Sequence, residues 1–115
     1  MGARKDTRYE AGGHVYIAEV LDTKAVLKNL SASGLCIEST EFMDIVPNSK
    51  YTISVVPEEE SNVDPFTIDI KSKWIRTKKD RSESGFVIVI PPGTSGSELL
   101  DEYLNFLSKH AKIAV

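Results

Sequence analysis

Apolar and polar side chains alternate along the segment from Phe66 to about Arg76, which carries the clearest pattern in the chain. Apolar residues and one serine occupy every second position, and mostly charged residues lie between them: Phe66, Ile68, Ile70, Ser72 and Trp74 against Thr67, Asp69, Lys71 and Lys73. Successive side chains of a β-strand point to opposite faces of its sheet, so this alternation predicts a central, half-buried strand. We expect Trp74 to lie on the buried face.

Five other segments are predicted to form strands, because they are rich in apolar and β-branched residues and are separated by turn residues. They run from His14 to about Leu21, Lys24 to about Ser31, Leu35 to about Ser39, Lys50 to Val56 and Gly85 to Ile90. The tight Asp22-Thr23 connection predicts a hairpin between the first two. The last segment is an unbroken apolar run, which indicates burial on both faces.

The carboxy-terminal segment is predicted to form one amphipathic helix. Ser95 and Glu98 have the spacing of a capping box, and apolar residues then recur at helical intervals: Leu99, Leu100, Tyr103, Leu104, Phe106, Leu107 and Ala111. Six strands without intervening helices favour an antiparallel barrel or sandwich, and a barrel also removes exposed sheet edges. We expect an all-β fold with one C-terminal helix, a six-stranded antiparallel β-barrel whose helix covers one opening.

Length and composition indicate a single domain of modest charge. The chain has 115 residues, and its 14 basic and 17 acidic residues give a net charge of -3, which argues against a general nucleic-acid binder. The single cysteine, Cys36, lies in an apolar run that suits a small residue within a sheet, so we expect no disulfide, catalytic or metal role for it. We find no nucleophile with a base, no paired catalytic acids and no phosphate-cradling glycine loop, so no enzyme is expected.

The chain opens without a charged-then-apolar signal peptide, and no apolar run approaches the roughly 18 residues that span a bilayer. We therefore expect a cytoplasmic protein that does not insert into a membrane.

The amino-terminal residues are polar and carry two arginines spaced four apart, Arg4 and Arg8. They offer little apolar surface for a core, and Gly12-Gly13 separates them from the first predicted strand. We expect residues 1–12 to form a flexible arm and residues 13–115 to form the barrel with its helix.

A second polar motif begins at Asn29, in the sequence Asn-Leu-Ser-Ala-Ser-Gly that ends at Gly34. Strand alternation places Asn29 and Ser31 on one face, where short polar side chains at the end of a strand also fit an ordinary hairpin turn. Gly34 accepts a positive φ or the close approach of another group. The same alternation places Leu27 on the face of Asn29 and Ser31, and it turns Val26, Lys28 and Leu30 toward the barrel interior. A lysine fits there only if it lies at the rim or if a bulge shifts the register.

Arg4-x-x-x-Arg8 followed about twenty residues later by Asn29-x-Ser31-x-x-Gly34 resembles the paired signature of PilZ domains, bacterial receptors for cyclic di-GMP. Trp74 late in a long strand, Gly85-Phe86 at the start of the last strand and a closing helix extend the resemblance over nearly the whole chain. It implies a split barrel of six antiparallel strands with a C-terminal helix.

The resemblance also implies how a ligand is held. Arg4 and Arg8 would wrap over cyclic di-GMP from the arm, Asn29 and Ser31 would contact it from the barrel wall, and Gly34 would let the backbone come near. Ordering of the arm would then signal to a protein partner, with no cofactor, metal or catalytic residue involved.

The alternative is a small barrel that binds single-stranded nucleic acid, or a protein partner, without a second messenger. Such a barrel normally presents aromatic side chains among basic ones on one face. Here Phe66 and Trp74 alternate with the charged residues and are expected to point inward, which makes this alternative the weaker one.

Overall fold

The computed structural model describes residues 7–17, 24–90 and 93–114. In this part of the chain the elements follow one another in this order: β1 (Tyr9–Glu10), β2 (His14–Tyr16), β3 (Ala25–Leu30), β4 (Gly34–Ser39), β5 (Lys50–Val56), a 3₁₀ turn at Glu59–Ser61, β6 (Phe66–Thr77), β7 (Ser82–Ile88) and α1 (Ser95–His110). The sequence predicted all of these elements except the 3₁₀ turn and the short strand β1. β1 lies within residues 1–12, the segment that was expected to form a flexible arm. The predicted Asp22-Thr23 connection falls outside the described residues, although β2 and β3 do pair.

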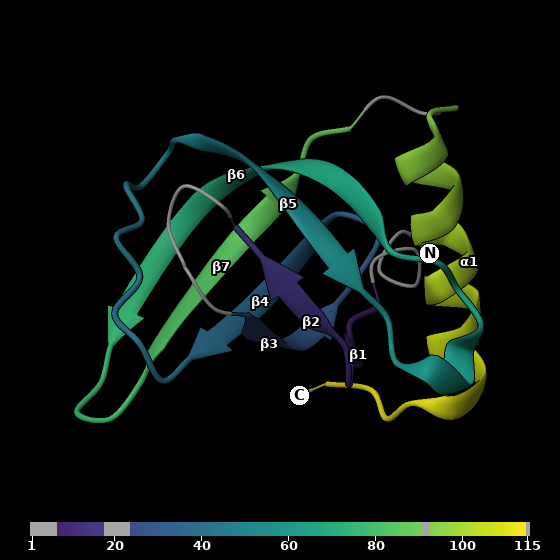
Figure 1. Ribbon diagram of the computed structural model, residues 1–115, viewed down its shortest axis with the longest axis horizontal. Helices are drawn as coiled ribbons and strands as arrows, with labels where there is room; N and C mark the ends of the chain where they lie inside the picture. Colours follow the sequence, from purple (N-terminus) through teal and green to yellow (C-terminus); the bar gives the residue numbers. More distant parts are fainter. Residues whose placement is uncertain (1–6, 18–23, 91–92, 115) are drawn as a thin grey trace.

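The sheet closes on itself because β3 is paired along both of its edges. Its strand order is β1-β3-β2-β5-β6-β7-β4, every neighbouring pair is antiparallel, and β4 also pairs with β3. β1 and β2 pair with different residues of β3, so they act as two halves of one interrupted barrel strand (Figure 1). The predicted fold is confirmed: a closed six-stranded antiparallel β-barrel with one C-terminal helix.

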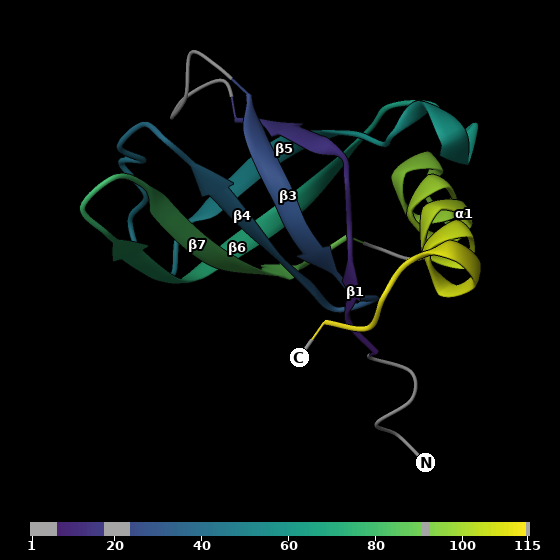
Figure 2. The same ribbon diagram turned by 90° about the horizontal axis from the view of Figure 1, so that it is seen from below.

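α1 lies against one end of the barrel, and its inner face joins the core (Figures 1 and 2) through three buried residues: Leu100, Tyr103 and Leu107. The hydroxyl of Thr94 accepts a hydrogen bond from the Ser97 backbone N–H at 3.1 Å, so the helix cap lies one residue before the predicted Ser95. Gly96 permits close packing, since a Cβ there would lie 2.4 Å from the Thr67 carbonyl oxygen of β6. None of the helical segments described has the length and apolar character that a membrane crossing requires.

β6 follows the predicted alternation only as far as Ser72. A β-bulge between Ser72 and Trp74 adds Lys73 to the strand, so that Ser72 pairs with Phe86 and Trp74 pairs with Gly85. Ser72 remains fully buried, whereas Trp74 is 40% exposed on the outside of the barrel. The expectation that Trp74 belongs to the core was therefore wrong, because the bulge reverses the facing of every residue beyond it.

The apolar run from Gly85 to Ile90 is also less buried than its composition suggested. Burial on both faces holds for β7 from Ser82 to Phe86, but Val87 and Ile88 are half-buried and Val89 is exposed. The strand ends at Ile88, two residues before the end of the predicted segment.

A second bulge, between Leu27 and Asn29, places Lys28 on the outside of β3. Leu27 is fully buried and Val26 is exposed, the reverse of the predicted faces. Beyond the bulge Leu30 is buried and Asn29 points outward, as predicted. The sequence left two explanations for Lys28, a position at the barrel rim or a bulge, and the structure shows the bulge.

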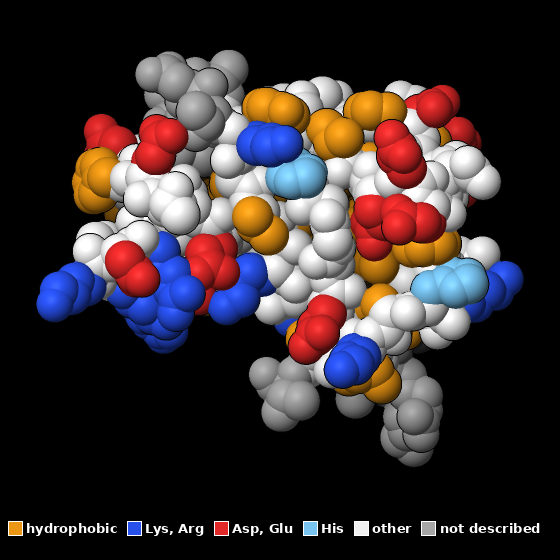
Figure 3. Space-filling model, turned by 60° about the horizontal axis from the view of Figure 1, so that its bottom comes forward, with side chains coloured by type: hydrophobic (Ala, Val, Ile, Leu, Met, Phe, Trp, Pro, Cys, Tyr) orange, Lys and Arg blue, Asp and Glu red, His pale blue; other side chains and the backbone are white. Residues whose placement is uncertain are grey.

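The outward Lys28 joins a charged cluster centred on Glu83, whose side chain is nearly buried. The Lys28 ammonium donates a 2.7 Å hydrogen bond to Glu83, and Arg76 and Lys78 lie 3.6 and 3.4 Å from the same carboxylate. The Lys28 hydrogen bond lowers the pKa of Glu83, and the same bond raises the pKa of Lys28. Figure 3 shows the basic side chains gathered at this end of the molecule (blue, left).

Glu83→Gln should lower the free energy of unfolding by about 1–2 kcal/mol near neutral pH. Hydrogen bonds to charged groups contribute about 1.5–3 kcal/mol, and the smaller value is expected here because Lys28 stays partly exposed to solvent. The folded state lowers the pKa of Glu83, so its contribution is complete above the usual glutamate range and is lost as the pH falls through and below it. Urea denaturation at about pH 7 and about pH 3 should therefore give a smaller difference between variant and wild type at the acidic pH. Glu102→Gln, on the exposed face of α1, is the control, and an equal effect from it would contradict this role for Glu83.

Candidate functional site

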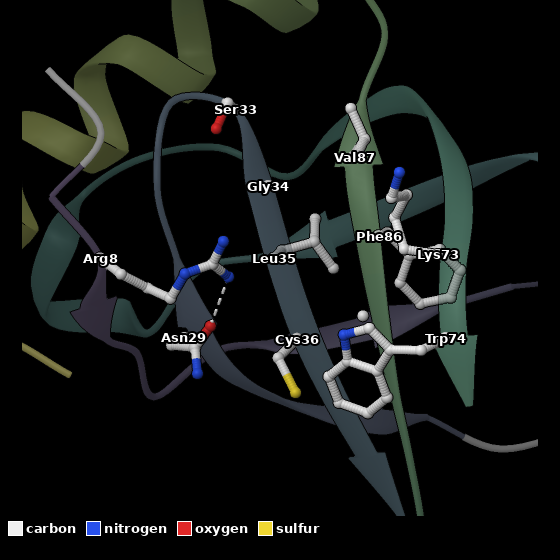
Figure 4. A pocket seen from close by; sticks show the side chains of 11 residues that line it. Arg8, Asn29, Ser33, Gly34, Leu35, Cys36, Lys73, Trp74, Phe86 and Val87 are labelled. Atoms are coloured by element: carbon white, nitrogen blue, oxygen red, sulfur yellow. Dashed lines mark hydrogen bonds between the residues drawn. The ribbon is translucent and has the colours of Figure 1, made fainter. Parts of the chain in front are cut away.

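Strand β1 brings the two sequence motifs into contact. Tyr9 pairs with Leu30 and Glu10 pairs with Asn29, so Arg8 lies beside the end of β3. Nη1 of Arg8 donates a 2.8 Å hydrogen bond to Oδ1 of Asn29, across 21 residues of sequence (Figure 4). This bond orients the guanidinium over the barrel wall and uses only one of its five N–H donors.

Ser31 holds the turn that follows. Its side chain is fully buried, and its hydroxyl accepts hydrogen bonds from the backbone N–H groups of Gly34 and Ser33 at 3.1 and 3.3 Å. The Ser31 backbone N–H donates to the Gly34 carbonyl oxygen at 2.8 Å. The motif serine thus shapes the backbone under the site and does not itself line the neighbouring cavity.

Gly34 is required by close packing and not by a left-handed backbone. A Cβ at this position would lie 2.8 Å from the Phe86 carbonyl oxygen and 3.0 Å from Nη2 of Arg8. Any other residue would push Arg8 away from the sheet or separate β4 from β7. The close approach expected at Gly34 is therefore made, in this structure, by Arg8.

A cavity of about 370 Å³ opens over β4 and β7 next to this turn. Its walls are formed by Arg8, Asn29, Ser33, Gly34, Leu35, Cys36, Lys73, Trp74, Gly85, Phe86 and Val87. In Figure 4, Arg8 and Asn29 lie on one side of the cavity and Trp74 and Lys73 on the other. Among these described residues there are two cations and no carboxylate, which suits an anionic ligand.

Trp74 forms the wall opposite Arg8 because Gly85 leaves room beneath it. A Cβ on Gly85 would lie 2.3 Å from the indole Nε1, so only glycine lets the ring rest on β7. Sequence reasoning missed Trp74, since nothing in the residues around it marks the bulge. Gly85 could have indicated this arrangement, because an isolated glycine inside a strand often marks a bulge or a place where another group packs closely against the backbone.

Cys36 lies on the cavity floor as a small, largely buried residue. Burial raises the pKa of its thiol, which keeps it protonated at neutral pH. A protonated thiol is a poor nucleophile and a poor metal ligand. In the described segments no three side chains of His, Cys, Asp or Glu gather as a metal site would require.

The predicted site residues are thus partly assembled. Arg8, Asn29 and Gly34 meet at one wall of the cavity, and Ser31 supports the turn behind it. Arg4 lies outside the described residues. The flexibility expected of the arm stays a prediction, although its described end, from residue 7 onward, includes the two paired residues of β1.

Neither protein-family models nor curated proteins match the sequence. Among solved structures, the Bacillus subtilis inhibitor of motility (MotI/DgrA) is similar, with a TM-score of 0.67 and 14% sequence identity. The similarity covers 93% of this chain and 52% of that one, so the present chain spans about half the length of that protein. At this identity the likeness shows the fold, which is the architecture that the resemblance to PilZ domains implied.

Ser31→Ala should lower the free energy of unfolding by about 1–3 kcal/mol, because the buried Gly34 N–H would lose its hydroxyl acceptor. Chemical denaturation monitored by circular dichroism measures this loss. Ser108→Ala is the control, since Ser108 is exposed on α1 and alanine is the better helix former. Equal stability of wild type and Ser31→Ala would show that the hydroxyl is not needed for the turn.

Proposed function

We propose that this domain is a receptor for cyclic di-GMP that acts through a protein partner and catalyses no reaction. The observation that carries the proposal is the Arg8–Asn29 hydrogen bond, which joins the two sequence motifs at the wall of a cavity. The described residues that line this cavity include two cations and no acid. The cavity volume lies within the range of about 300–1,000 Å³ that is usual for small-molecule sites.

The chemistry of the wall fits a cyclic dinucleotide. Beyond the N–H that bonds Asn29, the Arg8 guanidinium has further donors that suit a phosphate or O6 and N7 of guanine, and Asn29 has an amide for a base edge. Gly34 keeps the floor flat beneath the guanidinium. In this proposal the arm brings Arg4 over the ligand from the open side.

The energies are sufficient for a useful affinity. A micromolar Kd corresponds to about -8 kcal/mol. Two charge-assisted arginine contacts contribute about 1.5–3 kcal/mol each, and stacking of bases adds about 1–3 kcal/mol per base. For two arginines and two stacked bases these contacts sum to about 5–12 kcal/mol, a range that includes the value needed. Hydrogen bonds to the base edges add to this sum, and the cost of ordering the arm is subtracted from it.

A backbone connection offers a route from ligand to partner. The Arg8 carbonyl oxygen accepts a 2.7 Å hydrogen bond from the Ala114 N–H, and the Glu10 N–H donates to the Lys112 carbonyl oxygen at 2.8 Å. Figure 2 shows β1 beside the C-terminal segment, where Ile113 is exposed. A ligand that repositions Arg8 therefore acts on a segment that a partner can contact.

Binding of single-stranded nucleic acid is the second candidate, and the exposed Trp74 beside Arg76 favours it more than the sequence did. Base stacking on aromatic side chains is the usual basis of such binding. Phe66, however, is buried, and the net charge of the protein is negative. Phe66 and Trp74 therefore do not form a row of stacking surfaces along a basic groove. We therefore rank this function second.

Isothermal titration should give a Kd for cyclic di-GMP in the micromolar range or tighter, and much weaker binding of GMP, GTP and a short oligodeoxythymidine. Arg8→Ala and Asn29→Ala should each weaken binding by about 10- to 100-fold. Both variants should keep a melting temperature within about 5 °C of wild type, because the two side chains lie at the barrel surface. No heat and no thermal shift at high ligand concentration would refute the receptor, and preference for the oligonucleotide would favour the second candidate.

Saturating cyclic di-GMP should also slow backbone amide exchange in residues 1–8, because the proposed closure of the arm shields these groups. Exchange in the β5–β6 ladder serves as the internal control and should change little. Exchange that is already slow in residues 1–8 without ligand would exclude an ordering switch while leaving ligand binding intact.

A further inference from the structure

A second hollow, which we call the helix groove, opens at the α1 end of the barrel, away from the proposed ligand site. It lies where the 3₁₀ turn and the C-terminal end of α1 run side by side (Figure 1). Its volume of about 660 Å³ exceeds the 370 Å³ of the cavity beside Arg8. Two acids, two rings and two small residues line it: Gly12, Glu58, Glu60, Phe106, His110 and Ala111.

The acidic wall of the helix groove is held in place by hydrogen bonds. The hydroxyl of Tyr103, on the buried face of α1, donates to Oε1 of Glu58. Burial raises the pKa of Tyr103, so the hydroxyl keeps the proton that it donates. The Ser61 hydroxyl and backbone N–H both donate to the Glu58 carbonyl oxygen, at 2.7 and 3.0 Å. The turn and its carboxylate are therefore positioned before a partner binds.

The negative charge of this turn is not neutralised by neighbouring cations. Glu58, Glu59 and Glu60 follow one another, and none of them belongs to an ion pair within residues 7–17, 24–90 and 93–114. Figure 3 shows acidic side chains (red) beside exposed apolar ones at the right of the molecule, far from the basic end at the left. A groove with fixed negative charge attracts a cationic group.

Phe106 and His110 form the opposite wall and indicate which cation fits. They lie one turn apart on α1, with ring centroids 4.7 Å apart and an angle of 30° between the rings. A guanidinium is flat, packs on aromatic rings and can make two parallel hydrogen bonds to a carboxylate. A lysine ammonium has no flat face and keeps its water more strongly. The combination of carboxylates and aromatic rings therefore favours arginine.

We propose that the helix groove binds an arginine side chain of a protein partner, which bonds to Glu58 and Glu60 and packs on Phe106. This inference rests on the proposed function, because it names the surface through which a receptor without catalytic activity meets its partner. Gly12 joins the groove to the arm, since a Cβ on Gly12 would lie 3.3 Å from Oε2 of Glu58. Closure of the arm over cyclic di-GMP then alters this wall and changes the affinity for the partner.

Titration of the isotope-labelled protein with a short amidated peptide, in which one arginine lies between two leucines, tests the groove by NMR without cyclic di-GMP. The backbone amide signals of Gly12, Glu60 and His110 should shift and reach saturation. The same peptide with citrulline, which keeps the shape of arginine without its charge, should bind at least about 10-fold more weakly. A lysine peptide should bind with intermediate affinity.

Glu58→Gln should weaken binding of the arginine peptide by about 10-fold, because Glu58 is half-buried, and the exposed Glu60→Gln by about 2- to 5-fold. Glu59→Gln is the matched control. Glu59 is exposed on the same turn but is absent from the described lining of the groove, so this variant loses the same charge and should bind like the wild type. Circular dichroism establishes that each variant is folded, and Glu60→Gln decides the test if Glu58→Gln is not.

Several results would overturn the groove as an arginine site. Equal losses in Glu59→Gln and Glu60→Gln would show a general charge effect, and equal binding of the arginine and citrulline peptides would show contact through leucine alone. Shifts at the groove that depend on protein concentration without peptide would show that a second copy of the chain occupies it.

Cyclic di-GMP is added last, so that the two proposals are tested separately. A change in peptide affinity with bound cyclic di-GMP would support the link through Gly12, and an unchanged affinity would overturn that link. Failure of cyclic di-GMP to bind would refute the receptor and leave the peptide result standing.

Discussion

Closure of the sheet is the constraint on which the rest of this structure depends. Six strands close around one core only if some of them bend, and two strands do so at β-bulges. Each bulge contains a lysine, Lys28 in β3 and Lys73 in β6, and each is followed by a residue that points outward, Asn29 and Trp74. The opposite walls of the candidate site are therefore built by the same irregularity that lets the barrel close.

Two glycines complete this arrangement from below. Gly34 of β4 lies under the Arg8 guanidinium, and Gly85 of β7 lies under the Trp74 indole. Because neither carries a Cβ, a flat polar group and a flat apolar group both rest close to the sheet. Nearby acids are held elsewhere: Glu83 and Glu38 pair with Lys28 and other cations, so the cavity keeps a positive character in a protein of negative net charge.

The sequence by itself determined the C-terminal helix and six of the seven strands, and it favoured a barrel. Alternation marked β5 and most of β6, helical spacing marked α1, and the lack of helices between strands favoured closure. These signals can be read from the sequence because each is carried by residues that lie close together in it. The two polar motifs also pointed to Arg8, Asn29 and Gly34, which meet in the folded chain.

Only the tertiary structure decided whether each residue of the barrel strands faces the core or the solvent. A bulge adds one residue without any mark in composition, so the alternation placed Val26, Leu27 and Trp74 on the wrong faces. Ser31 is buried and holds the turn, which the sequence could not show, since its burial depends on how β3 meets β4. Trp74 entered the site because Gly85, eleven residues later in the chain, pairs with it across the β6–β7 ladder, and such a pairing exists only once the sheet has formed.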